Sequence, residues 1–585
     1  MNKKMKMRRS LATLVLSAAL LSAASLPAMA ADSENLAAVT SASSNASYSL
    51  SNKIEVEVKS ILNEHQSDQT KLGTVIRIKN TSDRITRVPD FELRGLMSDG
   101  VSYALQPSAK NPKSLQPKSQ VELSYLSNVE RSDEVALTSL NFIDVDMDVY
   151  PKAETTLLTI PVDAGDVWSG SDGIITNSSA ILKWGEAFTL PLLRSPLGFT
   201  PVDIHKEITV KGVSTVVQIR VSNPTNERQT VPNFGIDGKS ESKVYAGNRA
   251  EAAVILDPGE KKYIHIVIPT ELDTEFTSLN VVTPESFAVS LGEGKSLEDT
   301  YRVGRVNILL PTGAATQGVT TLPTYTLGTP VKLDSTNKFV PSNVDLSLVE
   351  LHVTSNEDDG FNTAVAKFKL TNNSERPIPI PAIQTELVSA DGYAYGGKRQ
   401  GATALTVVPN ASYVVSYSYA LPVSETGEGL KMNLYSQQSN GEVTYKSLLA
   451  SAKVPVQKND ATGKTLNVYP YEITIKDWSI TAIFQATMIY DYKLKLDLNI
   501  KPDKNVTVDK FTSMLSFELF DNVGNPIGKS VQPLSGEGRL YSGTNTIDLN
   551  ARSNQLDFPI QVKVFETFTN ENGESVKRLL TTFKQ

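Results

Sequence analysis

The sequence predicts an all-β protein built from about four antiparallel β-sandwiches in an elongated array. Three observations lead to this prediction. A block of the same pattern occurs at residues 76–91, 219–234 and 368–383. Short segments that alternate apolar and polar residues are separated by turn signals, as in sandwich folds. No convincing run of helical periodicity follows the N-terminal segment.

The N-terminal segment has the features of a secretory signal peptide. Basic residues precede an apolar stretch at 11–21, and Ala28-Met29-Ala30 matches the small-residue cleavage pattern. We therefore expect residues 1–30 to be removed and the mature protein to be secreted, extracellular or cell-wall associated. Arg8-Arg9 leaves the twin-arginine route as an alternative to ordinary secretion. Residues 31–46 are small and polar, which predicts a disordered segment.

The composition argues against several classes of protein. The chain contains no cysteine, which excludes disulfide bonds and the lipid-bearing cysteine of bacterial lipoproteins. Removing the five basic residues of the signal peptide from a chain of net charge −7 leaves −12. The charges form no long single-sign runs, so we expect no nucleic-acid partner. The apolar stretch is shorter than the roughly 20 residues of a membrane-spanning helix, and we expect no membrane span after cleavage.

The recurring block predicts a strand, a turn and the start of a second strand. Aligned on Asn80, Asn223 and Asn372, the three copies share a Ser or Thr two residues later and a proline nine residues later. The residues before each asparagine alternate between apolar and polar, which predicts a half-buried antiparallel strand. An asparagine here is expected to bond its own backbone two residues further on and form a turn. The proline suits the start or edge of a strand, because it cannot donate to a ladder.

A fourth, more divergent copy follows the first three. Leu496, Leu498 and Ile500 keep the alternation, while Pro502 takes the place of the asparagine. Polar, glycine-containing stretches mark the linkers. We expect a signal peptide, a disordered segment and four sandwiches, called repeats 1 to 4 below, at residues 47–163, 164–313, 314–458 and 459–585.

A wider set of residues around the block forms a recognisable pattern. In repeat 1 this set is Asn80, Ser82, Asp83, Pro89, Phe91, Leu93, Asp99, Gly100, Tyr103 and Pro117. Repeat 2 keeps Asn223, Pro232, Phe234 and Pro258-Gly259 but has a shorter middle, and repeat 3 has Ile383 in place of the phenylalanine. The pattern resembles the extracellular immunoglobulin-like domains of unknown function that occur in secreted and surface proteins of Gram-positive bacteria. This resemblance implies tandem immunoglobulin-like folds and an envelope location, and it supplies no catalytic residues.

Few residues are candidates for catalysis. The four histidines, His65, His205, His265 and His352, are scattered and lack metal-ligand spacing. Alternation places His265 on one strand face with Tyr263 and Val267. A Ser-His-Asp site assembled from distant positions stays open, although no nucleophile or metalloprotease motif is present.

One acidic group is a candidate cation site. Asp144, Asp146 and Asp148 alternate with apolar residues and would share one strand face. Calcium favours clustered carboxylates, but the EF-hand pattern does not fit these positions. A solvated strand face is the main interpretation, and a calcium site between domains is the alternative.

Aromatic residues are candidates for a sugar-binding platform. Trp168 and Trp184 lie in the first inter-repeat segment, and Trp478, Tyr490 and Tyr492 lie in repeat 4. Tryptophan more often packs against a sandwich core, which is the structural interpretation. A ligand site at Trp168 and Trp184 is the alternative.

These observations favour a non-enzymatic secreted or cell-envelope protein that acts as a multidomain spacer, adhesive or interaction scaffold without a cofactor. Its partner would be a cell-wall polymer or a surface or secreted protein. One alternative is a set of wall-polysaccharide or calcium-dependent binding modules. Another is an enzyme whose catalytic domain lies in residues 459–585, although that segment has an ordinary β pattern and no histidine.

Overall fold

A computed structural model describes residues 46–585 except 172, 210–211, 293–294, 312–321, 335, 357–359, 402–403, 440–443, 461, 485–488, 509–511 and 554–558. The expected signal peptide and residues 31–45 of the expected disordered segment lie outside the described residues. The described part is almost entirely β, which confirms the predicted fold class. Its only helical elements are three short 3-10 helices: η1 (Ala164–Asp166), η2 (Ser178–Ala180) and η3 (Pro191–Leu193). None of the described helices is long and apolar enough to cross a membrane.

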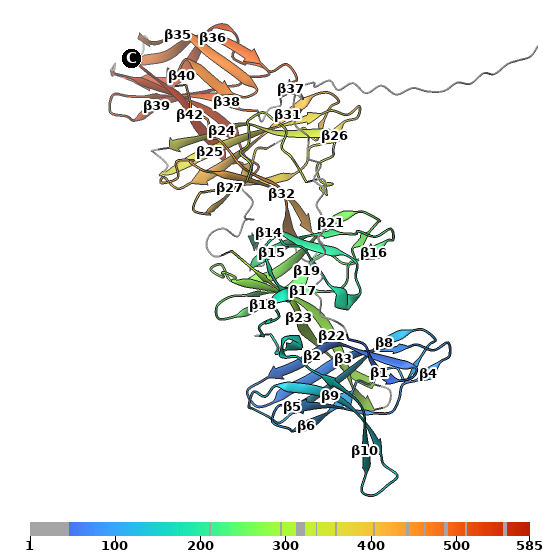
Figure 1. Cartoon of the computed structure of the whole chain (residues 1–585). Coiled ribbons are helices and arrows are strands. Elements are labelled where there is room, and N and C mark those ends of the chain that lie inside the picture. The colour runs from blue at the N-terminus through green and yellow to red at the C-terminus, as the bar shows by residue number, and fades with distance from the viewer. Residues whose placement is uncertain are drawn as a thin grey trace, which may run out of the picture. The chain divides into compact units, whose positions relative to one another are not determined.

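Each repeat contributes two layers of strands, which we call the front sheet and the back sheet (Figure 1). The two are separate sheets in repeats 2 to 4, whereas in repeat 1 the pairing of Gln106 with Leu126 joins them into one nine-stranded sheet. In repeat 1 the front sheet contains β1 (Tyr48–Ser51), β2 (Ile54–His65), β3 (Thr70–Asn80) and β8 (Gln120–Val129), and the back sheet contains β6 (Ser102–Pro107), β5 (Glu92–Met97), β9 (Leu137–Asp146) and β10 (Ala153–Pro161). In repeat 2 the front sheet contains β13 (Phe188–Thr189), β14 (Gly198–Thr209), β15 (Gly212–Ser222), β21 (Lys261–Thr270) and β19 (Asn248–Arg249), and the back sheet contains β12 (Ile181–Lys183), β23 (Lys295–Leu309), β22 (Ser278–Gly292), β17 (Gly235–Lys239) and β18 (Val244–Ala246).

The other two repeats are built in the same way. In repeat 3 the front sheet contains β24 (Val344–Asn356), β25 (Phe361–Asn372), β31 (Ser412–Leu421) and β29 (Lys398–Arg399), and the back sheet contains β28 (Ala394–Gly396), β27 (Ile383–Val388), β32 (Lys431–Ser439) and β33 (Thr444–Lys453). In repeat 4 the front sheet contains β34 (Thr465–Val468), β35 (Tyr471–Phe484), β36 (Tyr490–Pro502) and β40 (Gly543–Ser553), and the back sheet contains β39 (Pro526–Gln532), β38 (Met514–Phe520), β41 (Gln561–Thr569) and β42 (Ser575–Lys584). Short strands pair outside these sheets or join them: β4 (Thr86–Arg87) with β7 (Ser114–Leu115), β16 (Gln229–Thr230) with β20 (Ile255–Leu256), β26 (Ile378–Pro379) with β30 (Thr406–Val407), β11 (Val167–Trp168) with β2, and β37 (Val506–Thr507) with β31.

All four repeats share one connectivity. The first two long strands form an antiparallel hairpin, and a later strand pairs with the second of them, as in β2–β3–β8 and β35–β36–β40. The last two strands of the repeat form another hairpin. The first strand of this hairpin pairs with an earlier strand of the back sheet, as in β5–β9–β10 and β38–β41–β42. We call this the last hairpin of each repeat. Repeat 4 keeps the topology despite its divergent sequence, while the immunoglobulin-like assignment and the number of such domains stay predictions.

Each repeat has its own apolar core. Separate clusters of buried side chains occupy residues 48–167, 182–310, 325–456 and 466–583. The first cluster includes Val167, because β11 pairs with β2, so it passes the expected boundary at residue 163. Fully burying one large apolar side chain contributes about 1.5–3 kcal/mol. Each repeat therefore has an independent source of stability.

The recurring asparagine forms the predicted turn and a second set of bonds. In repeat 3, Oδ1 of Asn372 accepts hydrogen bonds from the backbone N–H and the hydroxyl of Ser374, at 2.9 and 2.7 Å. Its Nδ2 donates to the carbonyls of Arg376 and Val407, at 2.7 and 2.9 Å. One buried amide thus ties its own turn to β30, the short strand before β31. Asn80 and Asn223 are bonded in the same way.

The expectation of half-buried strands is wrong for the front sheets of repeats 1 to 3. Arg77 and Lys367 lie at positions that alternation assigns to the outer face, yet only 4% and 0% of their side-chain surfaces are exposed. Arg77 donates to the carbonyl of Leu192, which lies in repeat 2 between β13 and β14. The outer face of each of these sheets is covered by the following repeat.

Candidate functional sites at the contacts between repeats

A contact of one kind, between a last hairpin and a front sheet, occurs three times along the chain, although the strands that touch are not the equivalent ones each time. The last hairpins of repeats 2, 3 and 4 pack on the front sheet of the repeat before. Strand β22 contacts β8, β33 contacts β14 and β15, and β42 contacts β24 and β25. We call these contacts joint 1/2, joint 2/3 and joint 3/4. Most of the buried charged and histidine side chains discussed below lie in them.

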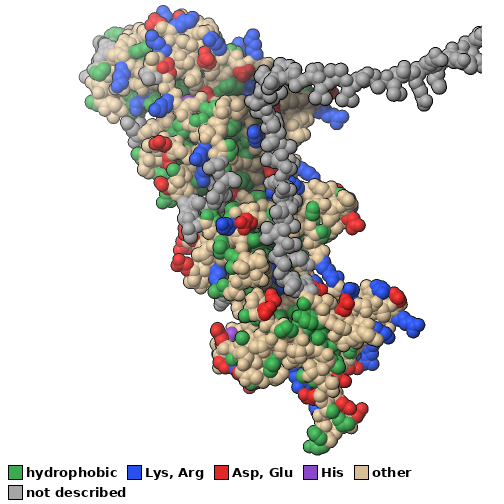
Figure 2. Space-filling model, viewed as in Figure 1, with side chains coloured by type: hydrophobic (Ala, Val, Ile, Leu, Met, Phe, Trp, Pro, Cys, Tyr) green, Lys and Arg blue, Asp and Glu red, His purple; other side chains and the backbone are tan. Residues whose placement is uncertain are grey.

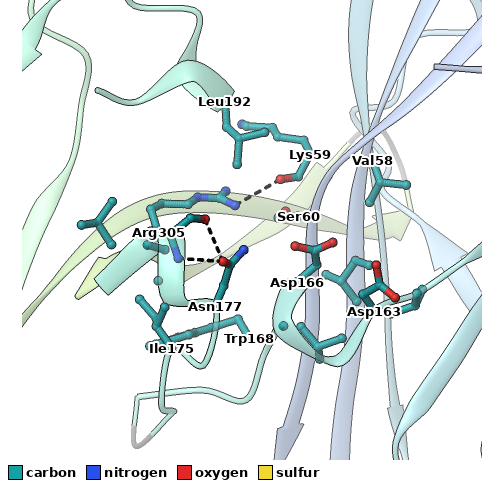
Figure 3. Close-up of a pocket in the computed structure, with 18 of the residues that line it drawn as sticks. Val58, Lys59, Ser60, Asp163, Asp166, Trp168, Ile175, Asn177, Leu192 and Arg305 are labelled. Atoms are coloured by element: carbon teal, nitrogen blue, oxygen red, sulfur yellow. Dashed lines mark hydrogen bonds between the residues drawn. The ribbon is translucent and has the colours of Figure 1, made fainter. Parts of the chain in front are cut away.

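Joint 1/2 contains a buried network of ion pairs. Nζ of Lys59 lies 2.9 Å from Glu285 and 2.9 Å from Glu122. Arg305 lies 3.0 Å from Glu285. It also donates to the backbone carbonyl of Lys59 at 3.1 Å (Figure 3). Burial lowers the pKa of Arg305. Because Lys59, Glu285 and Arg305 are each at most 8% exposed, the network is satisfied only while the two repeats stay together.

Joint 3/4 has an equivalent network with different residues. Nζ of Lys367 lies 2.6 Å from Glu566 and 3.0 Å from Glu350, and Arg578 lies 2.6 Å from Glu566. Burial alone would raise the pKa of Glu566, but the charges of Arg578 and Lys367 outweigh it and hold that pKa well below its usual range. Nearby, Nδ1 of His352 donates to the carbonyl of Gln457 at 3.1 Å.

Joint 2/3 contains two histidine–carboxylate pairs. Nδ1 of His265 lies 2.6 Å from Glu251, and Nδ1 of His205 lies 2.7 Å from Asp203. A carboxylate that orients a histidine also occurs in catalytic sites. Here, however, the ring of Tyr445 from repeat 3 packs on His265 with ring centres 4.7 Å apart. The side chains of His205 and His265 are only 8% and 2% exposed, and their Nε2 atoms have no hydrogen-bond partner among the described residues. The pairs are therefore part of the contact between repeats.

A cavity of about 180 Å³ lies beside joint 1/2. It is bounded by β2, by residues 160–193 and by β23 (Figure 3). Asp163 and Asp166 line it, and burial together with the charge of Asp163 raises the pKa of Asp166. The cavity therefore combines apolar walls with a small acidic edge.

The two tryptophans of this segment lie in different surroundings. Trp168 is 5% exposed and packs with Leu62 and Leu126 of repeat 1 and with Phe287 and Tyr301 of repeat 2. Its ring also covers Gly304, where an added Cβ would lie 2.3 Å from the ring. Trp184 is half-buried against the core of repeat 2. These positions make Trp168 part of joint 1/2, and a ligand site at either tryptophan stays a prediction.

The three aspartates do not share one strand face. Asp144 and Asp146 are exposed in β9, but the strand ends at Asp146, and Asp148 lies in the following turn. The backbone N–H of Asp148 donates to Oδ1 of Asp146 at 2.9 Å. No three His, Asp or Glu side chains in the described part of the chain form a group that could hold a metal ion. Calcium binding here stays a prediction and would require the turn to rearrange.

The sequence could not reveal the joints, because each pairs residues that are far apart in the chain. The only local sign of a joint is that charged residues stand at alternate positions of the predicted strands. Alternation alone places such residues in solvent. A fold also does not identify a function by itself. No known protein family and no curated protein matches the chain.

Proposed function

We propose that this protein is a non-enzymatic, exported scaffold of tandem immunoglobulin-like domains that acts as a spacer at or outside the cell envelope. The observation that carries this proposal is the threefold use of one kind of joint. Domains linked only by flexible segments move relative to one another by default. A protein whose repeats are joined by three buried contacts of hairpin on sheet has the means to hold its repeats in place.

The buried charges make the joints specific. Breaking a buried ion pair leaves an uncompensated charge and costs about 3–5 kcal/mol. In joint 3/4, Lys367 and Glu566 are fully buried and come from different repeats. Sliding or opening this joint would separate them. The network therefore favours one arrangement of the two repeats over others.

The joints also give a structural role to the buried side chains that could otherwise suggest a catalytic site. Glu251 and Asp203 hold their histidines by Nδ1, and tyrosines of repeat 3 pack on both rings. In joint 3/4, Lys367 and Arg578 are engaged by carboxylates. These interactions support a structural role for the most reactive buried groups.

Single-molecule energy transfer across joint 3/4 tests the spacer role. Because the chain has no cysteine, dyes can be placed by Tyr393→Cys in repeat 3 and Val523→Cys in repeat 4, which are 68% and 76% exposed. We expect a narrow distance distribution that broadens in Lys367→Met. Lys476→Met, at a side chain that is 56% exposed in repeat 4, is the matched control and should leave it narrow. A broad distribution in the unmodified joint would overturn the spacer role.

The proposed partner is a cell-wall polymer or a surface protein. Sedimentation of the purified protein with isolated cell walls, with and without calcium, tests the first. Saturable binding would support an adhesive role, whereas protein that stays in the supernatant would exclude direct wall binding. Trp184→Ala is the useful variant for a polysaccharide site, because Trp168→Ala would also damage joint 1/2.

A further inference from the structure

Two joint-forming surfaces have no partner among the described residues. One is the last hairpin of repeat 1, β9–β10, and the other is the front sheet of repeat 4, β35–β36–β40. The hairpin extends past its sheet (Figure 1). Its turn exposes Met147, Val149 and Tyr150 by 67%, 44% and 102%. Acidic and apolar side chains lie together at this tip (Figure 2).

The hairpin of repeat 1 carries carboxylates at the positions that form joints elsewhere. In both hairpins the pairing of the two strands shifts register at an equivalent point. In repeat 2 the shift lies between Val281 and Val282, and in repeat 1 it lies between the partners of Phe142 and Ile143. Three residues after this point stand Glu285 in repeat 2 and Asp146 in repeat 1. Glu285 binds Lys59 of the preceding repeat at 2.9 Å. Asp146 therefore presents an exposed carboxylate where its counterpart forms the ion pair of joint 1/2.

The front sheet of repeat 4 carries a matching lysine. The first long strand of repeat 1 has a register shift between Val58 and Ser60, with Lys59 at the shift. Strand β35 has the same irregularity between Ile475 and Asp477, with Lys476 at the shift. The side chain of Lys476 is 56% exposed, and Asp497 lies 3.9 Å from it on the same face. Lys476 thus occupies the position from which Lys59 binds the next hairpin.

This face is more polar than the other front sheets. Val216 and Val365 pack under the following hairpins of repeats 3 and 4. Counted back from the position of the recurring asparagine, the equivalent residue in repeat 4 is Lys495, which is exposed. At the end of β35, Ile483 and Phe484 are 39% and 56% exposed. A partner of this face would therefore be held by charges over most of its area and by apolar contact at one end.

We propose that the β9–β10 hairpin of one molecule docks on the β35–β36–β40 sheet of a second copy, with Asp146 opposite Lys476. The contact continues the pattern of the three internal joints from one molecule to the next. The hairpin and the sheet are different surfaces, so one molecule can use its hairpin and its sheet at the same time. Such a head-to-tail contact can join many molecules into chains. The proposal goes beyond the spacer role and does not depend on wall binding. The polar face predicts a reversible association that salt weakens.

Sedimentation velocity of the purified protein over a concentration series, in low salt with a chelator, tests the proposal. We expect larger species as the concentration rises. Asp146→Lys and Lys476→Glu should each weaken the association by about tenfold or more, because each places like charges opposite one another. Mixing the two variants should restore association, since the introduced lysine then faces the introduced glutamate. Asp90→Lys, at a side chain that is 86% exposed in repeat 1, is the control and should associate normally.

Three results would overturn the proposal. The unmodified protein could sediment as a single species at every concentration. The two charge-reversed variants could associate as strongly as the unmodified protein. Their mixture could remain as dissociated as either variant alone. Circular dichroism checks that both variants are folded, and energy transfer across joint 3/4 reports the spacer role separately.

Discussion

Acidification should loosen joint 3/4 through His352. The imidazole is 2% exposed, and its Nδ1–H is used by the carbonyl of Gln457. A proton would therefore have to be added at Nε2, which is buried without a hydrogen-bond partner among the described residues. Burial, assisted by the charge of Arg578, lowers the pKa of His352 from 6.5 to about 4, although Glu350 and Glu566 act in the opposite direction.

The sign of the effect follows from proton binding. Between pH 6.5 and pH 4, the opened or unfolded chain binds a proton at His352 that the closed joint does not, so stability falls as the pH falls. Above pH 6.5, His352 is neutral in both states and contributes no pH dependence. With about 1.4 kcal/mol per pKa unit, lowering the pH from 7 to 5 should cost about 2 kcal/mol.

Hydrogen exchange followed by mass spectrometry measures this loss of stability at joint 3/4 itself. The opening free energy of amides in β24, corrected for intrinsic exchange rates, should fall by about 2 kcal/mol more in the unmodified protein than in His352→Gln. Glutamine keeps a donor for the carbonyl of Gln457 but does not titrate. His65→Gln, outside the joint, is the control and should behave like the unmodified protein. An equal pH dependence in the unmodified protein and His352→Gln would refute the reasoning.

Three further substitutions test the packing described above. Lys367→Met should destabilise joint 3/4 by about 3–5 kcal/mol, seen as faster exchange in β25, because it leaves a buried carboxylate unpaired. Asn372→Ala should lower the free energy of unfolding of repeat 3 by about 1–3 kcal/mol in urea titrations, whereas Asn373→Ala at the exposed neighbouring position should cost less than about 1 kcal/mol. Gly304→Val should displace the ring of Trp168 and shift its fluorescence to longer wavelength, since the added Cβ would lie 2.3 Å from the ring; an unshifted spectrum would contradict the packing.

The elements that sequence reasoning predicted are those specified by neighbouring residues. Alternation around Asn372 indicated a strand, and the asparagine itself indicated the turn that its Oδ1 forms with Ser374. Alternation cannot distinguish Lys367 from Lys369, since both stand on the same strand face. Lys367 is fully buried and Lys369 is 27% exposed. The difference arises from repeat 4, whose hairpin reaches one lysine more completely than the other.

The candidate site shows the same limit. The sequence left Trp168 open between a core residue and an exposed platform, because a single tryptophan fits either. Its burial depends on Phe287 and Tyr301, which lie more than a hundred positions away. Alternation placed Asp148 with Asp144 because it assumed that the strand continued. The strand ends two residues earlier, where the hairpin turn begins.

The divergence of repeat 4 has a physical explanation in joint 3/4. Pro502 cannot tie its own loop as the asparagines of the other repeats do, and the loop after it is bonded to repeat 3 instead. Oδ2 of Asp503 lies 3.4 Å from Nζ of Lys369 in repeat 3, and it also accepts a hydrogen bond at 2.6 Å from Tyr469 within repeat 4. The carbonyl of Asn505 accepts from the backbone N–H of Ser412 at 2.8 Å, and β37 pairs in parallel with β31. The loop that holds a repeat together in the first three copies thus helps to hold two repeats together in the fourth, so in repeat 4 the contact with repeat 3 stands where the other repeats have the bonds of the asparagine.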